Sequence, residues 1–280
     1  MKKIVSKLTY NYELQLLLKY SLAFFFREIF WKFKNFFFKK RFKLKFNKNN
    51  YLGWSTVVLT TKLDKNIYNN IKSYKNKFNK KNNEIIIIAD KSDINISDKK
   101  IKLINLNSSR YTLGFKRNLG ISHCNYKNIF MTLDYTRLKK INIKGLNIEI
   151  KSFDLLVPRL ITLDNKRYLD WMFIDFPKIG KSFAPYNFNR TNYMYFHGTC
   201  YIFKKKFILK NLFSEFLDNK QGEDVSWSLR IRNNCFAKAS KNIIIQVQRK
   251  ANENKAITNG FFKENNKRLK YYLLKKDLVS

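Results

Sequence analysis

The sequence contains few of the residues that build metal centres and disulfide frameworks. Three cysteines and two histidines occur among its 280 residues, and no two cysteines form a Cys-x-x-Cys pair. This composition argues against a zinc ribbon, a disulfide framework and a multi-histidine metal site, and it fits a reducing cytosol. Acids are scarce too, because 20 Asp and Glu stand against 57 Lys and Arg. The positions of the few acids are therefore informative.

The N-terminal region lacks a long uncharged run, although it is rich in Leu and Phe. Charged residues such as Lys19, Arg27 and Glu28 interrupt it, whereas a membrane-spanning helix needs about 20 nearly uncharged residues. A signal peptide's compact apolar core with its cleavage site is missing as well. Aromatic residues mixed with Lys and Arg are typical of a helix in the membrane interface, and a helix packed on the protein's own core is the alternative. We predict that residues 1–50 form a basic amphipathic helical extension in peripheral contact with an anionic membrane.

The net charge of +37 indicates anionic partners: nucleic acid, acidic lipid or phosphorylated ligands. AT-rich coding, which over-uses Lys, Asn, Ile, Phe and Tyr, is the alternative source of the excess. A basic nucleic-acid-binding protein is one possible function. Against it, Lys is spread over the whole chain, and no RNP-like, KH or zinc signature occurs. We therefore predict no specific nucleic-acid partner.

Short apolar runs alternate with helical patterns in the middle of the chain. "WSTVVLTT", "EIIIIAD" and "NIFMTLDYT" predict buried strands, and residues 65–78 predict a helix. Such alternation predicts an α/β fold with a mostly parallel sheet flanked by helices. In "FDLLVPRLI" we expect Pro158 to mark the edge or end of a strand, and we expect residues 164–196 to form a substrate-facing loop region. We divide the chain into the extension, an α/β domain at residues 51–250 and a basic helical tail at residues 251–280.

Acids follow two of the predicted strands directly. Asp90 ends "EIIIIAD" and Asp134 ends "NIFMTLD", so in a parallel sheet they should meet at the edge where ligands bind. A carboxylate there can hold a divalent cation whose other ligands are phosphate and water. A helix N-cap or an Asx turn is the alternative for either acid. A third acidic position is the adjacent pair Glu223–Asp224, ahead of "VSWSLRI", whose alternation also allows a strand.

The motifs, in this order, resemble those of the family 2 glycosyltransferases, which are inverting enzymes with the GT-A nucleotide-sugar-binding fold. The resemblance covers roughly residues 51–250. "EIIIIADKSD" is similar to the family's second strand and acidic loop, with Ala89 in place of the first acid. "KRNLGIS" is similar to its Arg-Asn-x-Gly segment, and "FMTLDYTRL" falls where the DxD metal motif belongs, with Thr136 in place of the second acid. "YFHGTCYIFKKKF" resembles the acceptor-side strand, and "QGEDVSWSLRIR" resembles the Glu-Asp segment that begins a helix.

The resemblance implies a role for each matched residue. Asp224 would be the general base, since a carboxylate stays ionised and needs only hydrogen-bond reach to the acceptor hydroxyl. Glu223 would orient the acceptor or the base, and a helix-capping role for the pair is the alternative. Asp134 would hold Mg²⁺ or Mn²⁺. The residues implied to bind a nucleotide-diphosphate sugar are Asp90, Ser92, Arg117, Asn118 and Asp134.

The resemblance also implies an acceptor and a location. The acceptor would be a glycan or lipid-linked glycan of a bacterial surface polysaccharide, and the enzyme would act on the cytoplasmic face of the inner membrane. The missing acids at Ala89 and Thr136 leave open a glycosyltransferase-like protein without activity.

Overall fold

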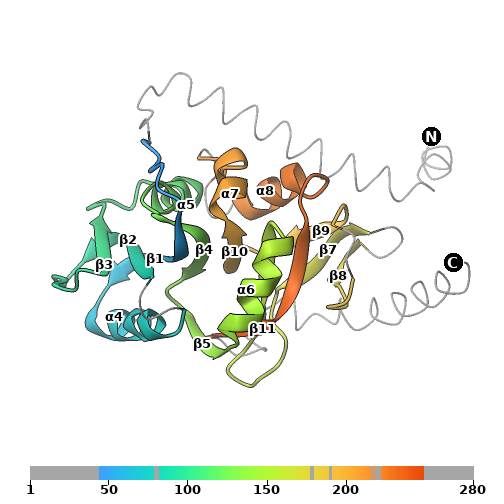
Figure 1. Cartoon of the computed structure of the whole chain (residues 1–280), viewed down its shortest axis with the longest axis horizontal. Helices are drawn as coiled ribbons and strands as arrows, with labels where there is room; N and C mark the ends of the chain where they lie inside the picture. The colour runs from blue at the N-terminus through green and yellow to red at the C-terminus, as the bar shows by residue number, and fades with distance from the viewer. Residues whose placement is uncertain are drawn as a thin grey trace, which may run out of the picture.

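The computed structural model describes residues 44–78, 82–176, 180–188, 191–215, 217 and 222–248. These residues form an α/β domain (Figure 1). The predicted C-terminal tail and nearly all of the predicted N-terminal extension lie outside the described residues, so both stay predictions. Among the described residues, no helix combines the length and the apolar character needed to cross a membrane.

One large sheet organises the domain. Strand β1 pairs in parallel with both β2 and β4, whereas β10 runs antiparallel to β4 and β6, and β5 runs antiparallel to β11. The predicted mostly parallel sheet is confirmed. In spatial order the eight strands are β3 (Ile101–Asn105), β2 (Asn83–Ser92), β1 (Tyr51–Leu63), β4 (Tyr126–Leu133), β10 (Cys200–Lys204), β6 (Leu155–Ile161), β11 (Ala237–Val247) and β5 (Thr136–Ile141).

Helices cover both faces of this sheet, because the central strands are apolar on both sides. Val57 of β1 belongs to the core shared with α5 (Leu113–Ser122), α7 (Lys205–Lys210) and α8 (Glu223–Ile231). The next residue, Val58, belongs to the core shared with α4 (Lys65–Lys72), the 3₁₀ turn η2 (Ser73–Asn76) and α6 (Ile143–Ser152). Successive side chains of a strand point to opposite faces, so a continuous apolar run fills both cores.

A second, three-stranded antiparallel sheet lies where the sequence predicted a loop. It consists of β7 (Trp171–Phe176) between β8 (Gly180–Phe183) and β9 (Met194–Phe196). Trp171, Met172 and Phe173 are all buried. A strand buried on both faces shows no alternation of apolar and polar residues, which is why the sequence pattern missed it.

The prediction for Pro158 was wrong. Strand β6 continues past Pro158 to Ile161 and lies inside the sheet, between β10 and β11. Its pairing with β11 shifts register just after the Ser240–Pro158 pair, and the pairing with β10 stops at Leu156. A proline without an amide hydrogen is tolerated at such an irregularity.

Phe130 provides a test of the core beneath α4. Its ring is fully buried, with its centroid 4.8 Å from that of Phe78 and 5.6 Å from that of Tyr74. Phe130→Ala should lower the free energy of unfolding by about 3–5 kcal/mol, because it removes the ring and leaves a cavity. Urea unfolding measures the loss. Phe236→Ala is the matched control, since Phe236 is 72% exposed, and equal losses for both variants would contradict the core assignment.

Candidate active site

Glu223 and Asp224 occupy the first turn of α8, where negative charge is favoured by the helix dipole. The preceding residue, Gly222, is the N-cap with a φ of 70°, and no side chain caps the helix. The adjacent carboxylates point to different partners, so capping does not account for the pair.

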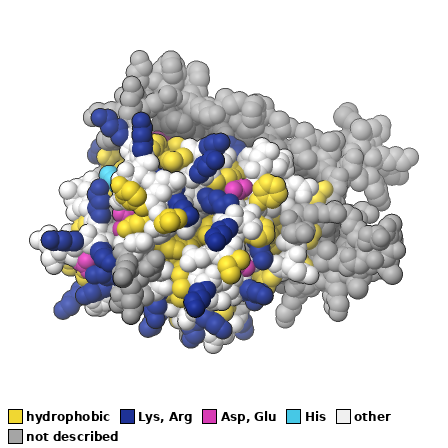
Figure 2. Space-filling model, viewed as in Figure 1, with side chains coloured by type: hydrophobic (Ala, Val, Ile, Leu, Met, Phe, Trp, Pro, Cys, Tyr) yellow, Lys and Arg dark blue, Asp and Glu magenta, His cyan; other side chains and the backbone are white. Residues whose placement is uncertain are grey.

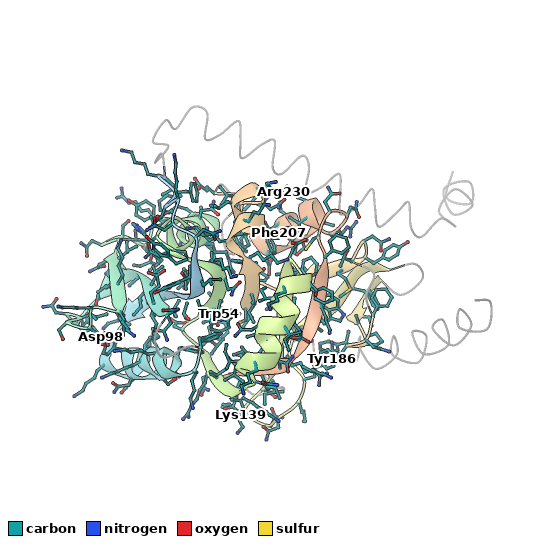
Figure 3. All side chains as sticks on the ribbon, viewed as in Figure 1. Trp54, Asp98, Lys139, Tyr186, Phe207 and Arg230 are labelled. Carbon is teal, nitrogen blue, oxygen red and sulfur yellow. The ribbon has the colours of Figure 1, made fainter. Side chains whose placement is uncertain are left out.

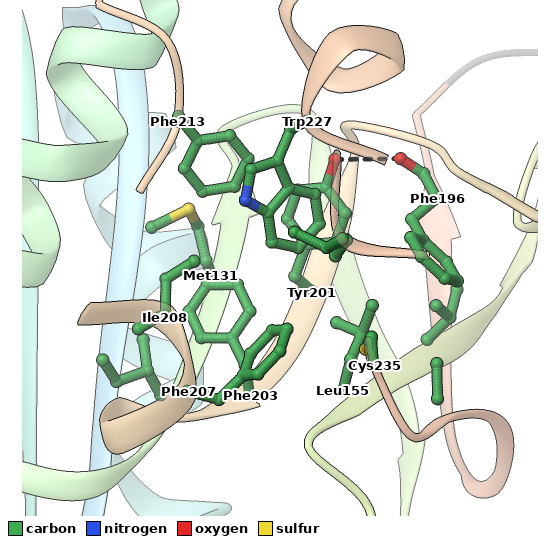
Figure 4. Close-up of a cluster of buried hydrophobic side chains, with 14 of the residues drawn as sticks. Met131, Leu155, Phe196, Tyr201, Phe203, Phe207, Ile208, Phe213, Trp227 and Cys235 are labelled. Carbon is green, nitrogen blue, oxygen red and sulfur yellow. Dashed lines mark hydrogen bonds between the residues drawn. The ribbon is translucent and has the colours of Figure 1, made fainter. Parts of the chain in front are cut away.

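The buried guanidinium of Arg117, on α5, holds Glu223. Its Nε donates a hydrogen bond to Glu223 Oε1 at 3.1 Å, and its Nη2 donates one to the carbonyl oxygen of Gly198 at 2.6 Å. The rings of Tyr201 and Phe213 lie 5.2 Å and 5.1 Å from the guanidinium carbon, within the aromatic cluster shown in Figure 4. Burial raises the pKa of Glu223, and the positive charge of Arg117 opposes that shift. A buried charge needs such a partner to be tolerated.

Both oxygens of the Asp224 carboxylate accept hydrogen bonds. Its Oδ2 accepts hydrogen bonds from the Tyr195 hydroxyl at 2.7 Å and from the Gly198 amide at 2.8 Å. Its Oδ1 accepts one from the amide of Val225 at 2.9 Å. Burial, followed by the charge of Asp224, raises the pKa of Tyr195 well above its ordinary value. Tyr195 therefore keeps its proton and donates a hydrogen bond to the carboxylate.

Gly198 permits this close approach. A Cβ at this position would lie 2.8 Å from Asp224 Oδ2 and 2.9 Å from Arg117 Nη2. The amide of Gly198 binds Asp224 and its carbonyl oxygen binds Arg117. One glycine thus connects the two acidic positions through backbone alone.

Asp90 and Ser92 lie at the carboxyl end of β2. Asp90 is 3% exposed, and the ammonium group of Lys116 from α5 lies 2.6 Å from its carboxylate. The ammonium nitrogen lies 2.6 Å from Oδ1 as well as from Oδ2, so both carboxylate oxygens face the cation. Ser92 closes a local turn, because its hydroxyl donates to the carbonyl oxygen of Ile94 at 2.9 Å. The neighbouring Ala89 is fully buried in the core on the opposite face.

Asn118, one residue after Arg117, is also used inside the protein. Its amide nitrogen donates to the Phe213 carbonyl oxygen at 3.0 Å and to Glu215 Oε1 at 2.9 Å. Its Oδ1 accepts from the Phe213 amide at 3.0 Å. Asn118 is 1% exposed and Arg117 is 0% exposed. Both side chains are buried and bonded within the protein, and their binding of the donor stays a prediction.

Asp134 follows β4, and its Oδ2 accepts a hydrogen bond from the Thr60 hydroxyl at 2.6 Å. It lines a cavity of about 530 Å³ together with Arg137, Gln248 and polar residues of α4. Thr136 is fully buried, and its hydroxyl donates to the Leu133 carbonyl oxygen. The position of the second DxD acid therefore faces the core. The described part of the chain contains no group of three or more His, Cys, Asp or Glu side chains placed to hold a metal.

The predicted site residues form two neighbouring groups, since Lys116 and Arg117 are consecutive on α5 and contact one group each. Asp90 and Asp134 share the carboxyl edge of the sheet, as expected, but Asp90 contacts α5 whereas Asp134 lines the cavity beside α4. Glu223, Asp224 and Arg117 form a second cluster with Gly198. Two residues of the site were not predicted from the sequence: Tyr195, which contacts Asp224, and Lys116, which contacts Asp90. The one indication of either residue in the sequence is its position inside a quoted motif, Tyr195 in "YFHG" and Lys116 in "KRN".

No known family model matches the chain, and no curated protein sequence matches it. Solved structures do match. A fragment of S. aureus TarS, residues 1–349, superposes with a TM-score of 0.52 and 15% identity, over 70% of this chain and 60% of that chain. The same fragment in complex with UDP-GlcNAc superposes with a TM-score of 0.51 and 14% identity, over 71% of this chain and 59% of that chain. GalNAc-T7 with UDP, GalNAc and Mn²⁺ superposes with a TM-score of 0.52 and 12% identity, over 72% of this chain and 44% of that chain.

The protein has the GT-A fold. Two different proteins superpose on it over 70% and 72% of the chain, and the sequence had predicted this fold from its motifs. The GT-A domain described here spans 60% of the TarS fragment. At identities of 12–15% the likeness establishes the fold, while family 2 membership stays a prediction.

Arg117→Met tests whether the buried guanidinium supports the site. This variant leaves Glu223 buried without its cation, so we expect a loss of about 3–5 kcal/mol in the free energy of unfolding. Urea unfolding provides the measurement. The double variant Arg117→Met with Glu223→Leu should recover much of the loss, because it removes both buried charges. Arg137→Met, at an exposed arginine, is the control, and a loss as large in the control as in Arg117→Met would disprove the support role.

Proposed function

We propose that this protein is an inverting glycosyltransferase that transfers a sugar from a nucleotide-diphosphate sugar to a glycan or lipid-linked glycan acceptor. The GT-A fold supports the proposal, since proteins of this fold were solved with UDP-GlcNAc and with UDP, GalNAc and Mn²⁺. The observation that carries it is the carboxylate of Asp224, which is partly exposed and rigidly held at the start of a helix.

Asp224 is proposed as the general base. Two donors already occupy its Oδ2, whereas its Oδ1 accepts only from the Val225 amide and keeps a lone pair for the acceptor hydroxyl. As the acceptor oxygen bonds to the anomeric carbon, the bond from that carbon to the diphosphate oxygen breaks. The proton of the hydroxyl passes to Asp224. Attack opposite the leaving diphosphate inverts the configuration.

Glu223, Arg117 and Asn118 are proposed as positioning residues. Glu223 is 3% exposed and bound to Arg117, which favours a role in orienting the base over contact with the acceptor. Arg117 also fixes Gly198, whose amide holds Asp224. Asn118 ties α5 to the Phe213 backbone. These contacts keep the Asp224 carboxylate in one place, as catalysis requires.

Asp90, Ser92 and Asp134 are proposed as the donor-binding residues. Asp90, at the carboxyl end of β2 where ligands of such sheets bind, would accept a hydrogen bond from the nucleoside. Asp134 keeps its Oδ1 for Mg²⁺ or Mn²⁺, since only its Oδ2 is bonded to Thr60. A cation bound there would neutralise charge on the leaving diphosphate, and phosphate and water would complete its ligands. Arg137 lines the same cavity and adds positive charge.

A GT-A protein without activity is the second candidate. The positions of the two missing acids, Ala89 and Thr136, are fully buried, so neither position faces the donor. Metal binding then depends on one carboxylate and on the donor's phosphates. An active enzyme would work at the cytoplasmic face of the inner membrane of a bacterium, with residues 1–50 contacting anionic lipid, and this location remains a proposal.

Asp224→Asn tests the base. The amide keeps the size of the side chain but cannot take up the proton, so transfer should fall by about 10²–10⁴-fold while donor binding stays nearly unchanged. Release of nucleoside diphosphate from a panel of nucleotide sugars, with acceptor present, measures the rate. Glu223→Gln should cause a smaller loss. Turnover by Asp224→Asn close to that of the wild type would exclude the assignment.

Asp134→Ala tests the metal site. It should weaken binding of uridine or guanosine diphosphate far more in Mn²⁺ than in EDTA, because only the metal-mediated part of the affinity is lost. Isothermal titration calorimetry provides both affinities. Asp93→Ala is the control, since Asp93 is an exposed acid paired with Lys62, and it should change neither. Equal weakening by Asp134→Ala in both conditions would remove the metal role.

A further inference from the structure

A cavity of about 630 Å³ lies at the amino-terminal edge of the sheet, away from the proposed catalytic edge. Trp54 of β1, labelled near α6 in Figure 3, lies at this cavity and donates its indole N–H to Asn147 Oδ1 at 3.0 Å. Asn128 of β4 lines it, six residues before Asp134. At about 3.3 Å per strand residue, the cavity lies about 20 Å from the metal candidate. It is therefore separate from the donor site.

The charged side chains that line this cavity are all basic. They are Lys127, Lys151, Lys204 and Lys206. Lys204 lies 3.6 Å from Asp154, and no carboxylate of the described residues pairs with the other three. Lysines elsewhere in the domain do find acids, as in the pairs Lys62–Asp93 and Lys75–Asp98. Figure 2 shows how few acids offset the basic side chains on this face. The cavity therefore has an uncompensated positive potential.

A buried amide points to a ligand independently of the charge. Asn128 is 7% exposed and its backbone pairs with Trp54 and Lys204 on the neighbouring strands. Its side chain makes no hydrogen bond to any other described residue, although it lines the cavity. Its polar atoms are not among the buried unpaired side-chain atoms of the described residues, so they are accessible from the cavity. An oxygen-rich ligand would accept a hydrogen bond from this amide.

We propose that this cavity binds a phosphate group, carried either by a lipid headgroup or by a soluble phosphorylated molecule. Ammonium groups and an amide N–H₂ supply donors only to acceptor oxygens, and lysine binds phosphate as a point charge. A volume of 630 Å³ is typical of small-molecule sites. The proposal is independent of the glycosyltransferase function.

The test uses the full chain with the double variant Lys127→Ala and Lys206→Ala. Lys139→Ala with Lys140→Ala is the matched control, because it removes the same charge from exposed positions on β5, and Figure 3 labels Lys139 well away from Trp54. Two probes distinguish the sources: inorganic phosphate followed by calorimetry, and phosphatidylglycerol vesicles followed by co-sedimentation. Asn128→Asp keeps every lysine but places a carboxylate in the cavity.

We expect the Lys127/Lys206 variant and Asn128→Asp each to weaken binding about tenfold or more, with the control near wild type. Weakening in the phosphate arm indicates a soluble ligand, and weakening in the vesicle arm alone indicates a lipid headgroup. Binding of uridine diphosphate with Mn²⁺ should stay unchanged in every variant, which separates this site from the donor site. Equal weakening by the control pair, or no weakening by the cavity variants in either arm, would overturn the proposal.

Discussion

The buried ion pair between Arg117 and Glu223 is the interaction on which the site depends. It joins α5 to the first turn of α8, and through the carbonyl oxygen of Gly198 it also holds the segment before β10. Removing a charge from water costs free energy, so a fully buried guanidinium is stable only where its N–H donors have hydrogen-bond acceptors. The aromatic rings of Tyr201 and Phe213 enclose it. The position of the Asp224 carboxylate follows from this arrangement.

Glu223 and Asp224 are consecutive residues, yet their carboxylates lie in different surroundings and make different contacts. Glu223 is turned into the core against a cation, and Asp224 stays partly exposed beside Tyr195 and Gly198. Their repulsion is relieved by separate partners rather than by a shared one. A rigid acid that can still accept a further hydrogen bond is what a general base requires. A helix cap needs only one acid, and here Gly222 takes that position.

The proposed donor-binding side contains few carboxylates. Asp90 and Asp134 share one edge of the sheet, yet β1 lies between their strands and they face different helices. The positions that lack acids, Ala89 and Thr136, point into the core under α4 and η2. Acid side chains there would be buried without solvent. Positive residues such as Lys116 and Arg137 stand near the remaining carboxylates, so neutralisation of a diphosphate falls partly to basic side chains.

The sequence by itself determined strands of the large sheet such as β1, β2 and β4, the sheet edge that carries Asp90 and Asp134, and the candidate base. Apolar runs such as "EIIIIAD" report burial directly, and motif order supplied the fold and the helix after Glu223. Only the tertiary structure decided which groups surround the base. Arg117 and Glu223 are 106 positions apart, and Tyr195 and Asp224 are 29 apart. Local periodicity carries no information about partners at such separations, because packing of whole elements brings them together. The same holds for β7, where Trp171, Met172 and Phe173 are buried in succession and therefore show no alternation.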